Sequence, residues 1–171
     1  PIWYSMLCFQ ANLTKLPALS PCLRAVIIQE NSIPIMRQNY QQFHAIYLLD
    51  LKNNHIIYIE PFSFSHFVTL KELDLSSNLI LSLKEKIFRG LQSLENLIID
   101  KNPLHAIMFG NLFGLSYLKK FSLHASCVRM LEAGSFRDLQ RLQTMDLSTN
   151  DIQAINKQTF QGLRKVRFIN M

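Results

Sequence analysis

Basic and imidazole side chains gather in the second part of this 171-residue chain. Residues 101–171 contain ten Lys and Arg against four Asp and Glu, whereas residues 1–100 contain eight of each kind. Cationic groups of this type attract phosphates and other anions, and an imidazole gains its charge near about pH 6.5. The candidate ligand-binding residues are Lys101, His105, Lys119, Lys120, His124 and Arg129. They predict either a site for an anionic partner or a surface that is basic only for solubility.

The sequence contains no arrangement of residues that is typical of an active site or a metal centre. It has no G-x-S-x-G, no H-E-x-x-H and no phosphate-binding glycine loop, and only five glycines in all. The five histidines lack zinc-ligand spacing relative to any pair of cysteines. We therefore expect a binding protein rather than an enzyme, with no cofactor and no metal.

One sequon, Asn12-Leu13-Thr14, adds a candidate modification site. The motif N-x-S/T is the acceptor for N-linked glycans in secreted proteins. Asn12 is therefore predicted to carry a glycan, which is consistent with a chain that enters the secretory pathway.

A repeat of 23 or 24 residues runs through most of the chain. In the template LKELDLSSNLI, which starts at Leu70, apolar residues occupy positions 1, 4, 6 and 11 and asparagine occupies position 9. Further apolar residues recur at positions 14, 19 and 22, and glycine occupies position 21 in three of the repeats. These are leucine-rich repeats. Their copies begin at Leu23, Ile46, Leu70, Leu94, Leu118, Leu142 and, incompletely, Val166.

The repeat predicts a solenoid of the α/β repeat class. Positions 3 to 8 alternate as a strand does, so positions 4 and 6 point into a shared core and the strands join into one parallel sheet on the concave side. The convex side is expected to be irregular or to hold short helices. An inward-facing amide at position 9 can bond the backbone groups that the turn leaves unpaired. This asparagine ladder comprises Asn31, Asn54, Asn78, Asn102 and Asn150, with Ser126 in the fifth repeat.

The two ends of the repeat array differ from its middle. Residues 1–22 lack the periodicity, and we expect them to form an N-terminal cap with a capping hairpin, before repeats that fill residues 23–171. Such caps are commonly joined by a disulfide, so Cys8 is expected to pair either with Cys22 or with a cysteine upstream of Pro1. Cys127 is expected to be a free thiol. The chain stops inside its seventh repeat without a C-terminal cap, which indicates a fragment of a longer array.

The repeat also places the candidate basic residues on surfaces that the core leaves free. Four of them occupy the concave positions 2, 3, 7 and 8, and two occupy the lateral position 12. Because neighbouring parallel strands lie about 4.8 Å apart, these side chains could contact a single polyanion. Exposed aromatic rings that would stack on bases are scarce, with Tyr47 and Tyr117 as the candidates.

The 24-residue repeat with phenylalanine at position 19 resembles the ectodomains of Toll-like receptors. The segments that carry the resemblance are FSHFVTLKELDLSSNLI, FRGLQSLENLIIDKNPL and FRDLQRLQTMDLSTNDI. The resemblance implies an innate-immune pattern-recognition receptor that binds a microbial ligand, with nucleic acid as one candidate, and forms a homo- or heterodimer. It implies a location on the extracellular or endosomal lumenal side of a single-pass membrane protein, whose transmembrane segment and signalling domain lie outside this sequence. The alternative is an extracellular adhesion or matrix protein that binds a protein partner through the concave face.

Overall fold

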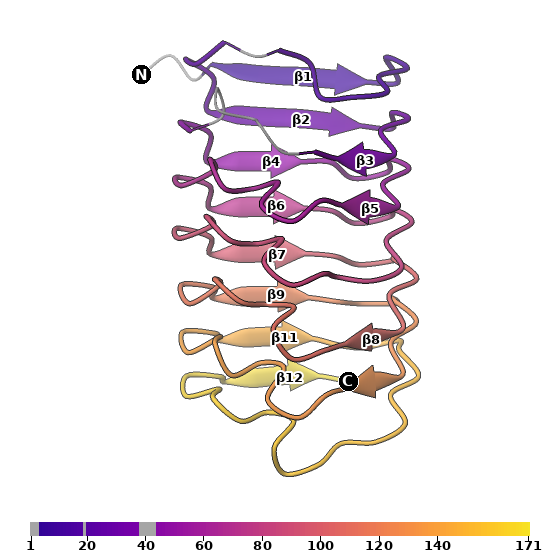
Figure 1. Ribbon diagram of the computed structural model, residues 1–171, viewed down its shortest axis with the longest axis vertical. Helices are drawn as coiled ribbons and strands as arrows, with labels where there is room; N and C mark the ends of the chain where they lie inside the picture. The colour runs from indigo at the N-terminus through magenta and orange to yellow at the C-terminus, as the bar shows by residue number, and fades with distance from the viewer. Residues whose placement is uncertain (1–3, 19, 38–43) are drawn as a thin grey trace.

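The computed structural model describes residues 4–18, 20–37 and 44–171, and its chain winds as a solenoid whose turns stack along one axis (Figure 1). Each turn contributes one strand to a parallel sheet of eight strands, in the order β1-β2-β4-β6-β7-β9-β11-β12. This confirms the predicted solenoid. The strands are β1 (Ser5–Phe9), β2 (Ala25–Gln29), β4 (Leu48–Asp50), β6 (Glu72–Asp74), β7 (Asn96–Ile98), β9 (Lys120–Ser122), β11 (Thr144–Asp146) and β12 (Phe168–Asn170).

The strands pair in the register that the repeat predicts. Position 4 is occupied by Leu49 of β4, Leu73 of β6, Leu97 of β7 and Phe121 of β9, which lie side by side across the sheet. All four are buried, as are most residues at positions 6, 11 and 22. Because side chains alternate along a strand, positions 3, 5 and 7 face the concave surface instead. One continuous core results, since no single turn can cover its own apolar face.

The convex side consists of turns, and the part of the chain that the structure describes contains no helix there. Of the two expectations for this side, the irregular one is therefore right. Left-handed residues, which a right-handed helix does not contain, occur in these turns, with φ of 65° at Phe62 and Lys86 in position 17 and φ of 106° at Gly90 in position 21. Phenylalanine rings at position 19 stack between turns instead, with 6.2 Å between the ring centroids of Phe64 and Phe88.

Short strand pairs lie where the turns continue from the sheet toward the convex side. Each strand has two residues and pairs with its counterpart in the next turn. The pairs are β3 (Ile35–Met36) with β5 (Tyr58–Ile59), and β8 (Ala106–Ile107) with β10 (Met130–Leu131).

Seven successive turns leave the sheet through a left-handed residue at position 8, with φ between 49° and 58°. A left-handed residue other than glycine costs roughly 1–2 kcal/mol, so the neighbouring bonds must hold it in place. The asparagine at position 9 supplies such bonds. Asn78 Nδ2 donates to the carbonyls of Leu51 and Leu75 at 3.0 Å each, and its Oδ1 accepts the amide of Ile56 at 3.0 Å. The residues at position 8 are Gln10, Glu30, Asn53, Ser77, Lys101, Ala125 and Thr149.

The same bond from position 9 to the preceding turn recurs along the ladder. The side-chain amides of Asn31, Asn54, Asn102 and Asn150 each donate to the carbonyl at position 6 of the preceding turn. Ser126 reaches the equivalent carbonyl, that of Ile99, with its hydroxyl at 3.1 Å. A shorter side chain therefore keeps the link between turns at the one repeat that departs from the pattern.

Residues 4–18 begin with a strand of the sheet, so the capping hairpin expected from the sequence is wrong. β1 runs parallel to β2, in a register that pairs Cys8 with Ile28, whereas a hairpin requires antiparallel strands. Cys8 takes the inward-facing position 6, and Cys22 lies exposed before β2. Ile28 is six residues beyond Cys22, which at about 3.3 Å per residue is too far for a disulfide. Among the residues that the structure describes, Cys8, Cys22 and Cys127 form no disulfide with one another, so the Cys8–Cys22 bridge is not formed here, and the pairing of Cys8 with a cysteine upstream of Pro1 stays a prediction.

Candidate ligand-binding face

A shallow hollow of about 330 Å³ lies on the concave face, over β7, β9, β11 and β12. Most of its residues come from positions 3 and 5, because odd positions of each strand face the concave side. Its polar lining is Asn96, Asp100, Lys120, Ser122, Thr144 and Asp146, and its apolar lining is Ile98, Phe121, Met145 and Phe168.

An aromatic ring and an ammonium group stand in one column of this hollow. Phe168 pairs with Thr144, and Thr144 pairs with Lys120 on the next strand. The ring and the ammonium group therefore start from strands about 10 Å apart. Phe168 is 60% exposed, so its ring is open to a ligand. The Lys120 ammonium group forms no ion pair with any residue that the structure describes.

Two carboxylates line the same hollow and balance its charge. Asp100 Oδ1 accepts the Ser122 hydroxyl at 2.6 Å and the His124 backbone amide at 2.8 Å. Asp146 Oδ1 accepts the hydroxyl and the backbone amide of Ser148 at 2.6 and 2.9 Å. The hollow is thus a mixed surface with one ammonium and two carboxylates.

A hydrogen-bonded chain fixes the tautomer of His124. Because the Ser148 hydroxyl donates its proton to Asp146, its oxygen accepts the bond from His124 Nδ1, at 2.9 Å. Nδ1 therefore carries a hydrogen. Nε2 has no hydrogen-bond partner among the described residues, which leaves it to take up a proton or to bond a ligand.

Burial and hydrogen bonding act in opposite directions on two carboxyl groups of the concave face. Burial raises the pKa of Asp50, and the hydrogen bonds that this carboxyl accepts from Lys52 and Gln29 only partly offset the effect. Burial also acts to raise the pKa of Asp146, but there the bonds from Ser148 outweigh it, and the pKa lies below its ordinary value. The net direction therefore depends on the balance between the depth of burial, which is greater for Asp50, and the hydrogen bonds that each carboxyl group accepts.

The six basic candidates fall into three separate places. Lys120 lines the hollow. His124 lies beside the hollow, because its ring is hydrogen-bonded through Ser148 to Asp146, a lining residue. Lys119 sits at the start of β9, where its Nζ is 2.7 Å from Glu95 Oε2. The other oxygen of Glu95 is 3.6 Å from Lys71 Nζ, and these two lysines lower the pKa of Glu95. The charge of Lys119 is therefore largely compensated.

The remaining three candidates lie on the opposite lateral side, where the turns leave the sheet. Lys101 and His105 are exposed there in the fourth repeat. Arg129 follows in the fifth repeat, with its Nε 3.5 Å from Asp151 Oδ2. Asn12, the predicted glycan site, is exposed in the loop after β1.

The pattern of basic residues in the sequence does not indicate several residues that line the hollow. Asn96, Ser122 and Thr144 are uncharged, and the exposed rings expected from the sequence are Tyr47 and Tyr117, not Phe168. Their signal was positional: all four lining residues occupy positions 3 or 5, which the repeat already assigned to the concave face.

Two kinds of feature are absent from the described ranges of the chain. No three His, Cys, Asp or Glu side chains there come together as a metal site would require. Nor do residues 4–18, 20–37 and 44–171 include a helix with the length and hydrophobicity to cross a membrane.

Comparison with known proteins identifies the fold. No curated protein matches the sequence. One similar solved structure is described as "Crystal structure of TLR13-ssRNA13 complex", with a TM-score of 0.69 and 20% sequence identity over 99% of this chain. The match spans 28% of the length of that chain. Residues 44–104 and 111–171, more than half of the sequence, match the leucine-rich repeat family. The chain belongs to the leucine-rich repeat family.

Proposed function

We propose that this chain is a ligand-binding part of an innate-immune receptor ectodomain of the Toll-like type, and that the concave hollow is where its ligand binds. One observation carries this proposal: the exposed Phe168 ring lines the same concave hollow as the Lys120 ammonium group, which forms no ion pair with the described residues. The likeness in fold to the TLR13 structure supports it. Such an ectodomain acts on the extracellular or endosomal lumenal side of a membrane, and dimerisation and signalling would need parts outside this sequence.

The chemistry of the hollow favours a nucleotide unit as the ligand. A phosphate would bind Lys120, a base would stack on Phe168, and amino groups of the base would donate to Asp100 or Asp146. The side-chain amide and hydroxyl groups that also line the hollow can form hydrogen bonds with the sugar. Single-stranded nucleic acid, whose bases are free to stack, fits this arrangement better than a duplex does.

Acidification is expected to strengthen such binding. An imidazole that takes up a proton becomes positively charged, and imidazoles commonly do so between about pH 5 and 8. The added charge attracts phosphate, so an acidic compartment would favour the bound state.

The test measures binding of fluorescent single- and double-stranded oligonucleotides at pH 5.5 and 7.4 with a salt titration. Stacking contributes about 1–3 kcal/mol per base, so Phe168→Ala is expected to weaken single-strand binding roughly tenfold. Lys120→Ala is expected to reduce the slope of log K against log salt by about 0.7. Lys101→Ala removes an exposed lysine on the other lateral side and serves as the matched control, with little expected change. No binding at either pH, or equal losses in all three variants, would contradict the proposal.

A second candidate function is protein binding in adhesion or in the extracellular matrix. Two apolar side chains are exposed on the concave side of β1, where Leu7 is 59% and Phe9 52% exposed, and Tyr4 is 54% exposed just before the strand. Contiguous exposed apolar side chains are typical of protein interaction surfaces. This candidate gains support if Leu7→Ser and Phe9→Ser abolish capture of a protein partner while oligonucleotide binding is absent.

A further inference from the structure

The basic residues of the last repeats gather at the edge of the sheet where the strands begin. One five-residue segment of each repeat boundary runs from position 23 of one repeat to position 3 of the next. In the last three boundaries these segments are residues 116–120, 140–144 and 164–168, and their fifteen residues include six basic and no acidic side chains. The same positions in the three preceding repeats, residues 44–48, 68–72 and 92–96, hold one lysine and two glutamates. The charge therefore changes sign along one surface of the solenoid.

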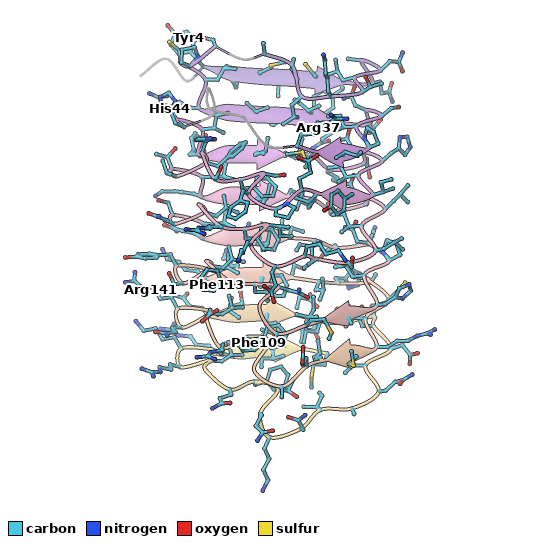
Figure 2. The ribbon with its side chains drawn as sticks, in the orientation of Figure 1. Tyr4, Arg37, His44, Phe109, Phe113 and Arg141 are labelled. Carbon is cyan, nitrogen blue, oxygen red and sulfur yellow. The ribbon has the colours of Figure 1, made fainter. Side chains whose placement is uncertain are left out.

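The backbone shows that these residues stack on successive turns. The amide of Lys119 donates to the Glu95 carbonyl at 2.9 Å, that of Gln143 to Lys119 at 2.8 Å, and that of Arg167 to Gln143 at 2.8 Å. Residues at position 2 thus form a column with about 4.8 Å between strands. Arg141 lies just before this column, and Figure 2 shows it on the side from which the strands start. Of the six basic residues, Lys120 lines the concave hollow, and we call the other five, Lys119, Arg141, Arg164, Lys165 and Arg167, the basic edge.

Most of the charge on the basic edge is uncompensated. Three of its residues are exposed and form no ion pair with any described residue: Arg164, Lys165 and Arg167. Asp138 borders the same convex hollow as Arg164 but forms no ion pair with it. Only Lys119 has a carboxylate partner, Glu95. Unpaired cations on neighbouring turns produce a local positive potential that attracts polyanions.

The aromatic ring of Tyr117, which lies beside this edge, already contacts a cation. The Arg141 guanidinium carbon lies 3.9 Å from the centroid of the Tyr117 ring, a cation–π contact that covers one face of the ring. Base recognition needs free ring faces, and the only other ring in these segments, Phe168, belongs to the concave hollow. The edge therefore offers guanidinium and ammonium groups without a stacking platform, which suits repeated sulfate groups better than bases.

We propose that the basic edge binds a linear sulfated polysaccharide of the heparin type. Guanidinium groups bind oxyanions through paired N–H donors, and lysine adds a mobile point charge. An extended chain with sulfates at short intervals can contact side chains on several successive turns at once. This site is separate from the concave hollow, and it would hold the protein at a cell surface or in a matrix whatever ligand the hollow takes.

The test is binding of the 171-residue chain to a fluorescent heparin oligosaccharide and to its desulfated counterpart, with titration of salt. The variant Arg164→Gln/Lys165→Gln/Arg167→Gln is expected to lose at least roughly tenfold in affinity and to show a smaller salt slope. The matched control is Lys15→Gln/Lys84→Gln/Lys157→Gln, which removes three exposed lysines elsewhere and is expected to retain near wild-type affinity. Thermal melting of both variants confirms that each still folds.

Three results would overturn the proposal. Equal losses in the edge variant and the control would show that net charge alone drives binding. Equal affinity for the desulfated chain would exclude sulfate recognition. Tighter, edge-dependent binding of an oligonucleotide would assign the surface to nucleic acid instead. The variant Lys120→Ala/Phe168→Ala separates the two sites, because it is expected to weaken oligonucleotide binding in the hollow and to leave polysaccharide binding unchanged.

Discussion

At the scale of single residues, two aspartates of the same sheet surface are expected to respond to pH with opposite sign. Asp146 has a folded-state pKa below 3.8, so its contribution to stability is present above that pH and is lost as pH falls through the lowered value. Asp50 has a folded-state pKa above 3.8, so stability is lost as pH rises from 3.8 through the raised value. The physical cause is that Asp50 is the more deeply buried of the two and also faces Asp74, whereas hydrogen bonds from Ser148 and Asn170 outweigh the weaker burial of Asp146.

Thermal melts between pH 3 and 7 test this difference. Relative to wild type, Asp146→Asn is expected to lose stability as pH rises. Asp50→Asn is expected to gain it, since the introduced amide oxygen can still accept the Lys52 backbone bond while Gln29 reverses its own amide. A change of 1 kcal/mol moves Tm by about 2–4 °C in a protein of this size, which is measurable. Parallel pH profiles for both variants and wild type would refute the assignment.

At the scale of the elements, the convex turns depend on glycine to different degrees. A Cβ on Gly90 would lie 2.6 Å from Ser65 Cα and 2.7 Å from the Phe64 carbonyl oxygen, and its φ is 106°. A Cβ on Gly134 would meet only the Phe109 ring, at 3.7 Å, with φ of 72°. Backbone cannot move aside as a side chain can, so the two turns respond differently to the same added methyl group.

We therefore expect Gly90→Ala to destabilise the fold by about 3 kcal/mol or more, and Gly134→Ala by about 1 kcal/mol. Urea unfolding followed by circular dichroism gives both values. Similar losses at the two positions would mean that strain in φ alone, and not the close approach of successive turns, determines the need for glycine. The three glycines at position 21, Gly90, Gly114 and Gly162, share this conformation, with φ of 98° to 106°.

At the scale of the whole molecule, the structure separates two charged surfaces that composition alone merges into a net charge of +6. The concave hollow combines Lys120 with two carboxylates and adjoins His124, whereas the basic edge consists of Arg and Lys. Arginine and lysine keep their charge across the physiological range, but imidazole does not. The two surfaces should therefore differ in how binding depends on pH.

Binding of the sulfated oligosaccharide is expected to change less than roughly twofold between pH 7.4 and 5.5, while oligonucleotide binding increases over the same interval. Both titrations use the same preparation at a fixed salt concentration, and His124→Gln is expected to remove the increase for the oligonucleotide only. An equal pH response of the two ligands would indicate that they share one surface.

The sequence by itself determined the fold, because the 24-residue repeat specifies which side chains face inward on every turn. Leu73, Leu97 and Phe121 lie in one layer of the core for that reason, and Asn78 bonds the turn before it. The convex side was less determined, since its irregular path depends on left-handed residues such as Lys86, whose conformation no local pattern revealed.

Only the tertiary structure decided which surface residues act together. Lys119 and Lys120 are adjacent in sequence, yet one is paired with Glu95 at the edge of the sheet and the other lines the hollow. Phe168 and Lys120 lie in the same column of the sheet, on either side of Thr144, although 48 positions separate them in the sequence. The same holds at the first turn, where an irregular sequence pairs in parallel with β2. The physical reason is that burial repeats with the period of the chain, whereas ion pairs and surface columns depend on which side chains the stacked turns bring into contact.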